Sequence, residues 1–220
     1  MPQAIIFDID GTLVDSVDAH AESWARTFSH FGYDVPAADA RFQIGKGGDQ
    51  LMPELVGEVA AREHGAAMAD WRADLFKRDY LPKLRAFPRV PDLFRHIRAR
   101  GQRVALASSA KGDELEAYKR IAGIADLVDK ETSSDDAEKS KPNPDIFAAA
   151  LERLGLPPDQ VVAVGDTHYD AEAAGRAGMG TVGLLCGGFP EEVLRGAGCI
   201  AIYRDPAALL ADYAGSPLAH

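Results

Sequence analysis

The stretch Ile5-Ile6-Phe7-Asp8-Ile9-Asp10-Gly11-Thr12-Leu13-Val14-Asp15-Ser16 decides how the chain folds, because an apolar run ends there in two carboxylates and a glycine. Residues i and i+2 of an extended strand point to the same side, so Asp8 and Asp10 can be presented together. Gly11 permits a sharp turn. Two like charges this close need a cation or a shared proton, which predicts a metal site or an acid and base pair. A strand followed by an ordinary Asp-Gly turn is the alternative interpretation.

The composition bounds the class of protein. A length of 220 residues favours a core domain with an insertion over two equal domains. No segment has the apolar length of a membrane span, and we find no signal peptide ahead of the first strand. The two cysteines, Cys186 and Cys199, fit neither a disulfide framework nor a common zinc pattern. The net charge of -10 argues against nucleic-acid binding. We therefore expect a cytoplasmic monomer or weak homodimer that acts on a small molecule, without nucleic-acid or membrane partners.

The order of the predicted elements indicates the architecture. Apolar residues recur at helical spacing from Val17 to Phe31, and the pattern stays helical up to about Tyr80, with a break at Glu63-His64-Gly65. From Val90 onward, strands alternate with helices, which is typical of a parallel sheet wrapped by helices. The sequence thus predicts an α/β fold. We expect a Rossmann-like core of residues 1–14 and 84–220, with helices on both faces of its sheet. An all-helical cap of residues 15–83 is inserted after the first strand. The last seven residues are expected to be frayed.

Polar side chains follow several predicted strands where each one ends. Ser108 and Ser109 come after Val104-Ala105-Leu106-Ala107, and Asp166 comes after Val161-Val162-Ala163-Val164-Gly165. Lys141 lies in the loop Lys139-Ser140-Lys141-Pro142-Asn143-Pro144, just ahead of a predicted helix. Taken singly, these residues are ordinary turn, cap or surface residues. As a set they predict a ligand site, because parallel sheets bind ligands beyond the carboxyl ends of their strands.

These four stretches resemble, in order, the motifs of the haloacid dehalogenase-like (HAD) hydrolases. Asp-Ile-Asp-Gly-Thr is similar to the opening motif, Leu-Ala-Ser-Ser to the second, Ser-Lys-Pro-Asn-Pro-Asp-Ile-Phe to the third, and Val-Gly-Asp-Thr-His-Tyr-Asp to the fourth. The helical insertion matches the cap of the subfamily that includes phosphoglycolate phosphatase and β-phosphoglucomutase. The resemblance implies a Mg²⁺-dependent phosphatase that hydrolyses a small phosphate monoester.

The resemblance also implies a role for each matching residue. Asp8 attacks phosphorus and forms an aspartyl phosphate, while Asp10 acts as general acid and then as general base. The remaining residues of the motifs fall into two groups. The catalytic helpers Ser108 and Lys141 act with the substrate-binding residues Gly11, Thr12 and Ser109, and the metal ligands are Asp8, Asp10, Asp166 and Asp170. Oxygen ligands of this kind suit Mg²⁺. His168 occupies a variable position of the fourth motif, and we expect no role for it.

Three other functions remain open at this point. A sugar-phosphate mutase of the β-phosphoglucomutase type resembles the chain in its cap, but that subgroup places Glu-Asp where this chain has Gly165-Asp166. A dehalogenase lacks the second aspartate of the opening motif, and a catalytically silent binding protein would have lost a catalytic residue. For the substrate, Lys46 between Gly45 and Gly47 is a candidate selector, although these glycines also fit a simple helix break.

Overall fold

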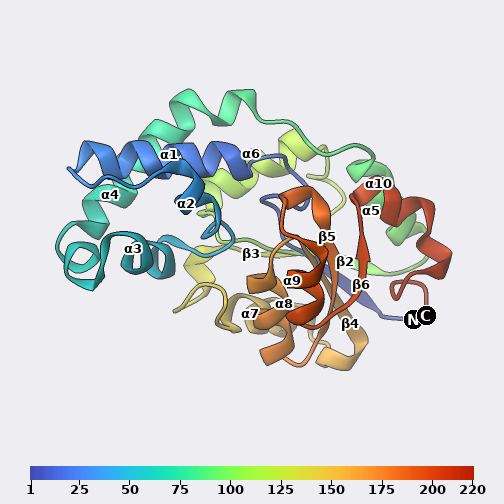
Figure 1. The fold of residues 1–220 in the computed structure, drawn as a ribbon. Coiled ribbons are helices and arrows are strands. Elements are labelled where there is room, and N and C mark those ends of the chain that lie inside the picture. Colours follow the sequence, from blue (N-terminus) through green and yellow to red (C-terminus); the bar gives the residue numbers. More distant parts are fainter.

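Six parallel strands form one sheet, and the chain enters it near the middle (Figure 1). The computed structural model describes residues 1–220. The strand order is β3-β2-β1-β4-β5-β6, and the strands are β1 (Ala4–Phe7), β2 (Arg103–Ala107), β3 (Lys130–Thr132), β4 (Val161–Gly165), β5 (Gly180–Leu184) and β6 (Cys199–Tyr203). The chain builds outward from β1 to β3 on one side and from β4 to β6 on the other. The order therefore reverses between β1 and β4, where sheets of this kind bind ligands.

Helices cover both faces of the sheet, as the alternating pattern predicts. On β1, Ile5 and Phe7 face one apolar cluster while Ala4 and Ile6 face the other, since successive residues of a strand point to opposite sides. The first cluster is completed by α5 (Val90–Ala99), α6 (Gly112–Ala122) and α10 (Pro206–Ala211), and the second by α7 (Asp145–Leu154) and α8 (His168–Arg176). The short helix α9 (Glu191–Gly196) packs against β6 and α8. The predicted α/β architecture is confirmed.

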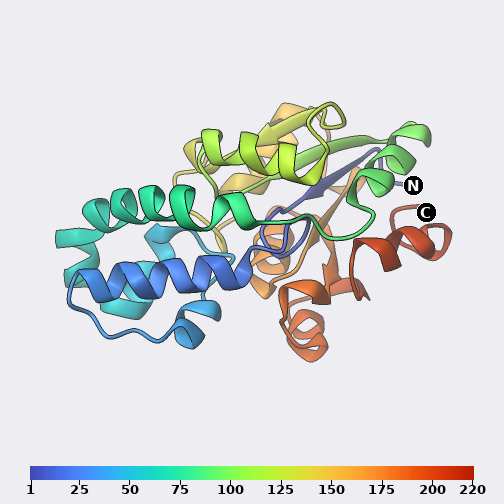
Figure 2. The same ribbon diagram turned by 90° about the horizontal axis from the view of Figure 1, so that it is seen from above.

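The first four helices of the chain follow β1 and lie to one side of the sheet (Figures 1 and 2). They are α1 (Val17–His30), α2 (Ala37–Arg41), α3 (Gly48–Val56) and α4 (Glu58–Asp79). In Figure 2, α1 and α4 run side by side, and both chain termini lie at the far end of the molecule from them. Trp24, Phe28 and Met68 belong to an apolar cluster that these helices form among themselves. We call residues 15–83 the cap and keep these predicted limits as a proposal.

The helix break inside the cap differs from the prediction. The helix α4 runs without interruption through Glu63-His64-Gly65, and the break lies at Gly57, whose φ of 85° is a left-handed conformation that favours glycine. Gly65 is buried, and a Cβ built on it would lie 3.4 Å from Cε of Met52 on α3. That distance is ordinary van der Waals contact, so Gly65 lies where α4 packs against α3. The predicted break at this glycine is wrong, because tertiary packing overrides the low helix propensity of a single glycine.

The end of the chain is also ordered, although the sequence predicts fraying. Ser216 and Leu218 are fully buried, and Gln102 Nε2 donates a hydrogen bond of 2.8 Å to the Leu218 carbonyl. Leu218 joins the apolar cluster beneath α5 and α10, so burial of one side chain anchors the terminus. None of the helices combines the length and the apolar character that crossing a lipid bilayer requires.

Candidate active site

Two adjacent strands bring three carboxylates together at the point where the strand order reverses. Asp8 follows β1, Asp166 follows β4, and the Asp8 amide donates to the Val164 carbonyl at 2.9 Å, which holds these two strand ends side by side. Asp170 lies in the first turn of α8. One carboxylate oxygen from each aspartate can be chosen so that all three lie within 4.8 Å of one another. All three side chains are buried.

Lys141 provides the positive charge at the centre of this group. Its side chain is completely buried, and its ammonium contacts Asp8 Oδ1, lies 2.8 Å from Asp170 Oδ1 and donates to the Ala107 carbonyl at 3.1 Å. Burial disfavours the charged form, but the carboxylates of Asp170 and Asp8 outweigh burial and raise the pKa of Lys141. The lysine is therefore held as a cation against the oxygen that the sequence predicts to attack.

One ammonium does not balance three buried carboxylates. Burial, together with the charges of Asp170 and Asp10, raises the pKa of Asp8 to about 7 despite the opposing effect of Lys141. Burial and the charges of Asp170 and Asp8 raise the pKa of Asp166 well above its usual value, and Asp166 Oδ2 has no hydrogen-bond partner. This unpartnered oxygen in an all-oxygen donor set fits a hard divalent cation such as Mg²⁺.

Thr12 and Gly11 support the carboxylates from the turn after β1. Thr12 is completely buried, and its hydroxyl donates to Asp166 Oδ1 at 2.8 Å and lies 3.2 Å from Asp8 Oδ2. The Gly11 carbonyl accepts a hydrogen bond from the Cys186 thiol at 3.1 Å. In this structure both residues therefore act on other side chains of the site, and their predicted contact with substrate stays a prediction.

Asp10 lies beside the other carboxylates but in a different environment. Its Oδ1 accepts a hydrogen bond from Ser16 Oγ at 2.5 Å and lies 2.8 Å from His20 Nε2. Burial would raise the pKa of Asp10, but the contacts with His20 and Ser16 outweigh burial and lower the pKa to about 2. The guanidinium of Arg72 donates to His20 Nδ1. Because arginine only donates, Nδ1 accepts, and the proton on Nε2 points to Asp10.

The surroundings of Asp10 include residues that sequence reasoning missed. Tyr118 on α6 lies with its hydroxyl 2.9 Å from His20 Nε2 and donates to Glu114 Oε1 at 2.8 Å. The only signal for His20 in the sequence is its position four residues after Ser16, on the same face of α1. Arg72 and Tyr118 gave no such signal, since α4 and α6 reach Asp10 only through tertiary packing.

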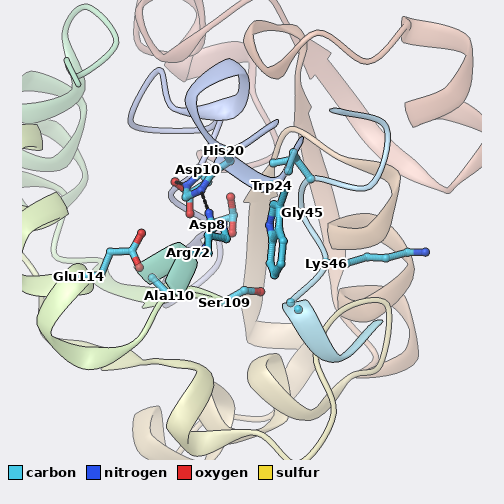
Figure 3. Close-up of a pocket in the computed structure, with 13 residues that line it drawn as sticks. Asp8, Asp10, His20, Trp24, Gly45, Lys46, Arg72, Ser109, Ala110 and Glu114 are labelled. Carbon is cyan, nitrogen blue, oxygen red and sulfur yellow. Dashed lines mark hydrogen bonds and ion pairs between the residues drawn. The ribbon is translucent and has the colours of Figure 1, made fainter. Parts of the chain in front are cut away.

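The predicted phosphate-binding serines occupy different positions. Ser108 is completely buried, and its Oγ accepts a hydrogen bond from the Ala110 amide at 3.1 Å. Ser109 lines a cavity of about 70 Å³ between the cap and the sheet, together with Asp8 and Asp10. Figure 3 shows Ser109 below Asp8 at the edge of this space. The cavity, which we call the catalytic cavity, is the one that opens onto the paired aspartates.

The structure does not bring the Lys46 ammonium to the carboxylates. Its Nζ donates to Gln43 Oε1 at 2.7 Å, lies 3.9 Å from Glu54 Oε1 and sits 4.9 Å from the centre of the Tyr169 ring. Figure 3 shows the side chain extending away from Asp8 and Asp10. Substrate selection by Lys46 stays a prediction. In this structure Arg72, rather than Lys46, is the cation of the cap nearest to the network around Asp10.

Comparison with known proteins accords with this site. A crystal structure described as a hydrolase from Pseudomonas syringae superposes with a TM-score of 0.91 at 25% sequence identity, covering 98% of this chain and 99% of that one. A phosphoglycolate phosphatase from Yersinia pseudotuberculosis is 30% identical over 192 residues, which are 84% of this chain and 82% of that protein. The Arabidopsis thaliana protein SUPPRESSOR OF QUENCHING 1, chloroplastic, is 30% identical over 92% of this chain, but the match spans only 19% of that longer protein.

The match to a protein family covers the cap and most of the sheet. The model of the haloacid dehalogenase-like hydrolases aligns with residues 2–178, a range that contains all the residues of the carboxylate cluster and Lys141. The four motifs that resemble this family in the sequence all fall inside that range. The chain belongs to the haloacid dehalogenase-like hydrolases.

Proposed function

We propose that the protein is a Mg²⁺-dependent phosphatase that hydrolyses a small phosphate monoester through an aspartyl phosphate on Asp8. The observation that carries the proposal is the buried Asp8 carboxylate, held against the Lys141 ammonium and next to a second aspartate in a different environment. Asp8 faces a cation, which suits a nucleophile that must be ionised, whereas Asp10 is held apart by Ser16 and His20, which suits a separate role in proton transfer. A relative that is named phosphoglycolate phosphatase supports the same reaction.

The proposed reaction has two steps that use these residues in turn. An oxygen of Asp8 attacks phosphorus, and the departing ester oxygen takes a proton from Asp10. Asp10 then removes a proton from water, which attacks phosphorus, releases phosphate and restores Asp8. Asp10 is a carboxylate before substrate binds, because its pKa is about 2. A phosphoryl dianion beside it adds negative charge and favours the protonated form that the first step requires.

Lys141 and the metal site divide the charge between them. The Lys141 ammonium lies against Asp8 and reduces repulsion between the attacking carboxylate and the phosphoryl oxygens. The side chains of Asp8 and Asp166 and the carbonyl of Asp10 would hold Mg²⁺, with Asp170 acting through water. When bound, the ion supplies further positive charge at the phosphoryl group.

Gly165 supports a phosphatase over a mutase. The mutases that the chain resembles carry a glutamate at this position, and here a Cβ on Gly165 would lie 2.5 Å from the Asp170 Cβ. No side chain fits in that space while Asp170 keeps its present place. The presence of Asp10, with its own hydrogen bonds, likewise supports phosphoryl transfer over dehalogenation.

We also propose where the protein works, what it acts on and in which oligomeric state. Cys186 and Cys199 are free thiols, which suits the reducing cytoplasm. We propose a small phosphorylated metabolite as the substrate, and a monomer or weak homodimer as the working form.

Initial rates against a panel of phosphate monoesters, with Mg²⁺ and with excess chelator, test the proposed function. We expect turnover that requires Mg²⁺ and is inhibited by Ca²⁺, because the larger ion with its looser coordination would misplace the nucleophile. Full turnover in excess chelator would contradict the metal assignment. Absence of turnover with every ester in the presence of Mg²⁺ would contradict the phosphatase.

The pKa of Asp8 also predicts how Mg²⁺ stabilises the protein at different pH values. A pKa of about 7, raised from 3.8, means that the folded metal-free protein holds this proton more tightly than the unfolded chain. That contribution to stability is fully present below pH 3.8 and is lost as the pH rises through about 7. Mg²⁺ binds the ionised carboxylates. At one fixed concentration of Mg²⁺, we therefore expect the ion to raise the melting temperature more near pH 8 than near pH 5.

Differential scanning calorimetry of the metal-free protein, with and without added Mg²⁺, measures this shift directly. The variant Asp166→Asn serves as the control, because it removes a proposed ligand and should lose most of the Mg²⁺-dependent shift at both pH values. An equal shift at the two pH values in the unaltered protein would refute the link between Asp8 ionisation and metal binding.

A further inference from the structure

A second, larger cavity adjoins the catalytic cavity. Its volume is about 330 Å³, against about 70 Å³ for the first. It lies between helices α3 and α4 of the cap and the core segments 109–111 and 134–140. Six residues line both cavities, so the two spaces meet there: Trp24, Gly47, Gly48, Arg72, Ser109 and Glu114. We call the larger space the distal cavity. A group esterified to a phosphate at Asp8 can extend into it past these residues.

The walls of the distal cavity are partly apolar and partly polar. Trp24, Met52 and Ile146 provide apolar surface, with the small side chains of Ala69 and Ala73 on α4. Ser134 and Lys111 contribute polar groups from the core. Small-molecule sites have volumes of about 300 to 1,000 Å³ and combine apolar surface with a few polar groups. The distal cavity is at the lower end of this range, which suits one sugar-sized group and is far larger than a two-carbon acid needs.

A hydrogen-bond donor and an acceptor meet where the two cavities join. Arg72 donates to Ser23 Oγ at 3.1 Å and to His20 Nδ1. Its Cζ lies 4.6 Å from the centre of the Trp24 ring. No carboxylate lies within ion-pairing distance of its guanidinium. Glu114 accepts from Tyr118 and likewise has no ion-pair partner. Figure 3 shows Arg72 and Glu114 on the same side of the catalytic cavity. A hydroxyl group can accept from the one and donate to the other.

The charges around the two cavities disfavour an anionic leaving group. Acidic side chains outnumber basic ones among the residues that line the distal cavity: Asp49, Glu114 and Glu138 against Arg72 and Lys111. A carboxylate that contacts Arg72 would also meet Glu114, which carries the same sign of charge. An uncharged hydroxylated group meets no such repulsion and satisfies donor and acceptor alike.

We propose that the leaving group of the substrate is an uncharged, polyhydroxylated group of about sugar size, held in the distal cavity, and that Glu114 selects it against small carboxylates. This inference rests on the proposed phosphatase activity and narrows its substrate class. The apolar face of the leaving group packs on Trp24, and its hydroxyl groups lie between Arg72 and Glu114. Phosphoglycolate, whose leaving group is a two-carbon acid, leaves the distal cavity unfilled.

The kcat/KM values for glucose 6-phosphate, sorbitol 6-phosphate, phosphoglycolate and methyl phosphate test the substrate class in the unaltered enzyme with Mg²⁺. We expect at least one of the two polyol phosphates to exceed phosphoglycolate by about tenfold or more, because a hydroxyl group can pair with both Arg72 and Glu114, whereas a small carboxylate faces the charge of Glu114. A preference for phosphoglycolate over both polyol phosphates would overturn the inference while leaving the phosphatase in place. Failure to hydrolyse any of the four esters would overturn both.

Filling the distal cavity tests where the leaving group lies. Ala69 on α4 lines this cavity and not the catalytic one, whereas Ala66 on the same helix is exposed and lines neither. Ala69→Phe should lower the ratio of kcat/KM for the preferred polyol phosphate to that for methyl phosphate by about tenfold or more, and Ala66→Phe should leave the ratio unchanged. An unchanged ratio in folded Ala69→Phe would place the leaving group elsewhere.

The charge of Glu114 gives a second test that does not depend on repacking. Glutamine keeps the size of the side chain and the oxygen that accepts from Tyr118, but it removes the negative charge. Glu114→Gln should therefore raise kcat/KM for phosphoglycolate relative to the preferred polyol phosphate by about tenfold. If both esters change by the same factor, Glu114 does not select the leaving group.

Discussion

Replacing Asp8 by asparagine is expected to lower kcat by at least about 10⁴-fold, because an amide cannot act as the nucleophile. The amide has nearly the volume of the carboxylate. Its oxygen can still accept from Lys141, and its NH2 group can donate to the Thr12 hydroxyl, which itself donates to Asp166. We therefore expect the circular dichroism spectrum to be unchanged. The measurement is single-turnover and steady-state hydrolysis of the best ester at saturating Mg²⁺.

Asp10→Asn is the matched comparison, because the same chemical change is made two residues away. It should lower kcat by about 10² to 10⁴-fold through loss of proton transfer, which is less than the loss of the nucleophile. An ester whose leaving group needs no proton, such as an aryl phosphate with a strongly acidic phenol, should be less affected by Asp10→Asn than by Asp8→Asn. Residual turnover of several per cent in pure Asp8→Asn would sink the assignment of the nucleophile.

Lys141→Met is expected to have the second largest effect, and it should appear in stability as well as in turnover. The ammonium is completely buried between Asp8 and Asp170, so its removal leaves two buried carboxylates without their cation. Breaking a buried ion pair by removing one partner costs about 3 to 5 kcal/mol of unfolding free energy. Turnover should also be lost, since the charge that faces the transferring group is gone.

Lys119→Met provides the control for this prediction. Lys119 is also nearly buried at 8% exposure, and it contacts Glu131 and Glu116 on the outside of the core, away from the cavities. We expect a smaller loss of stability in urea unfolding and a kcat close to that of the unaltered protein. Mg²⁺ should restore part of the stability of Lys141→Met and none of that of Lys119→Met. Equal losses of turnover in both variants would mean that Lys141 acts through the fold rather than at the site.

Several features of this protein could be predicted from the sequence because they depend on neighbours along the chain. The continuous apolar run of β1 and the regular succession of strands and helices after Val90 determine a parallel sheet with two covered faces. Since parallel strands end at one edge, the residues after β1 and β4 are brought close together by that topology alone. The proximity of Asp8 and Asp166 follows from this topology. The family could also be predicted, because its four motifs are short local stretches of sequence.

Other features were decided only by tertiary structure. Gly65 lies inside α4, where this helix packs against α3, and the last residues are ordered because Leu218 reaches the core. The hydrogen bond from Arg72 to His20 joins residues that are 52 positions apart, and Tyr118 is 98 positions from His20. Local sequence patterns carry information about the first few neighbours on a helix or strand. They carry none about which face of α4 or α6 meets Asp10, so the network and the distal cavity depend on how the cap packs on the sheet.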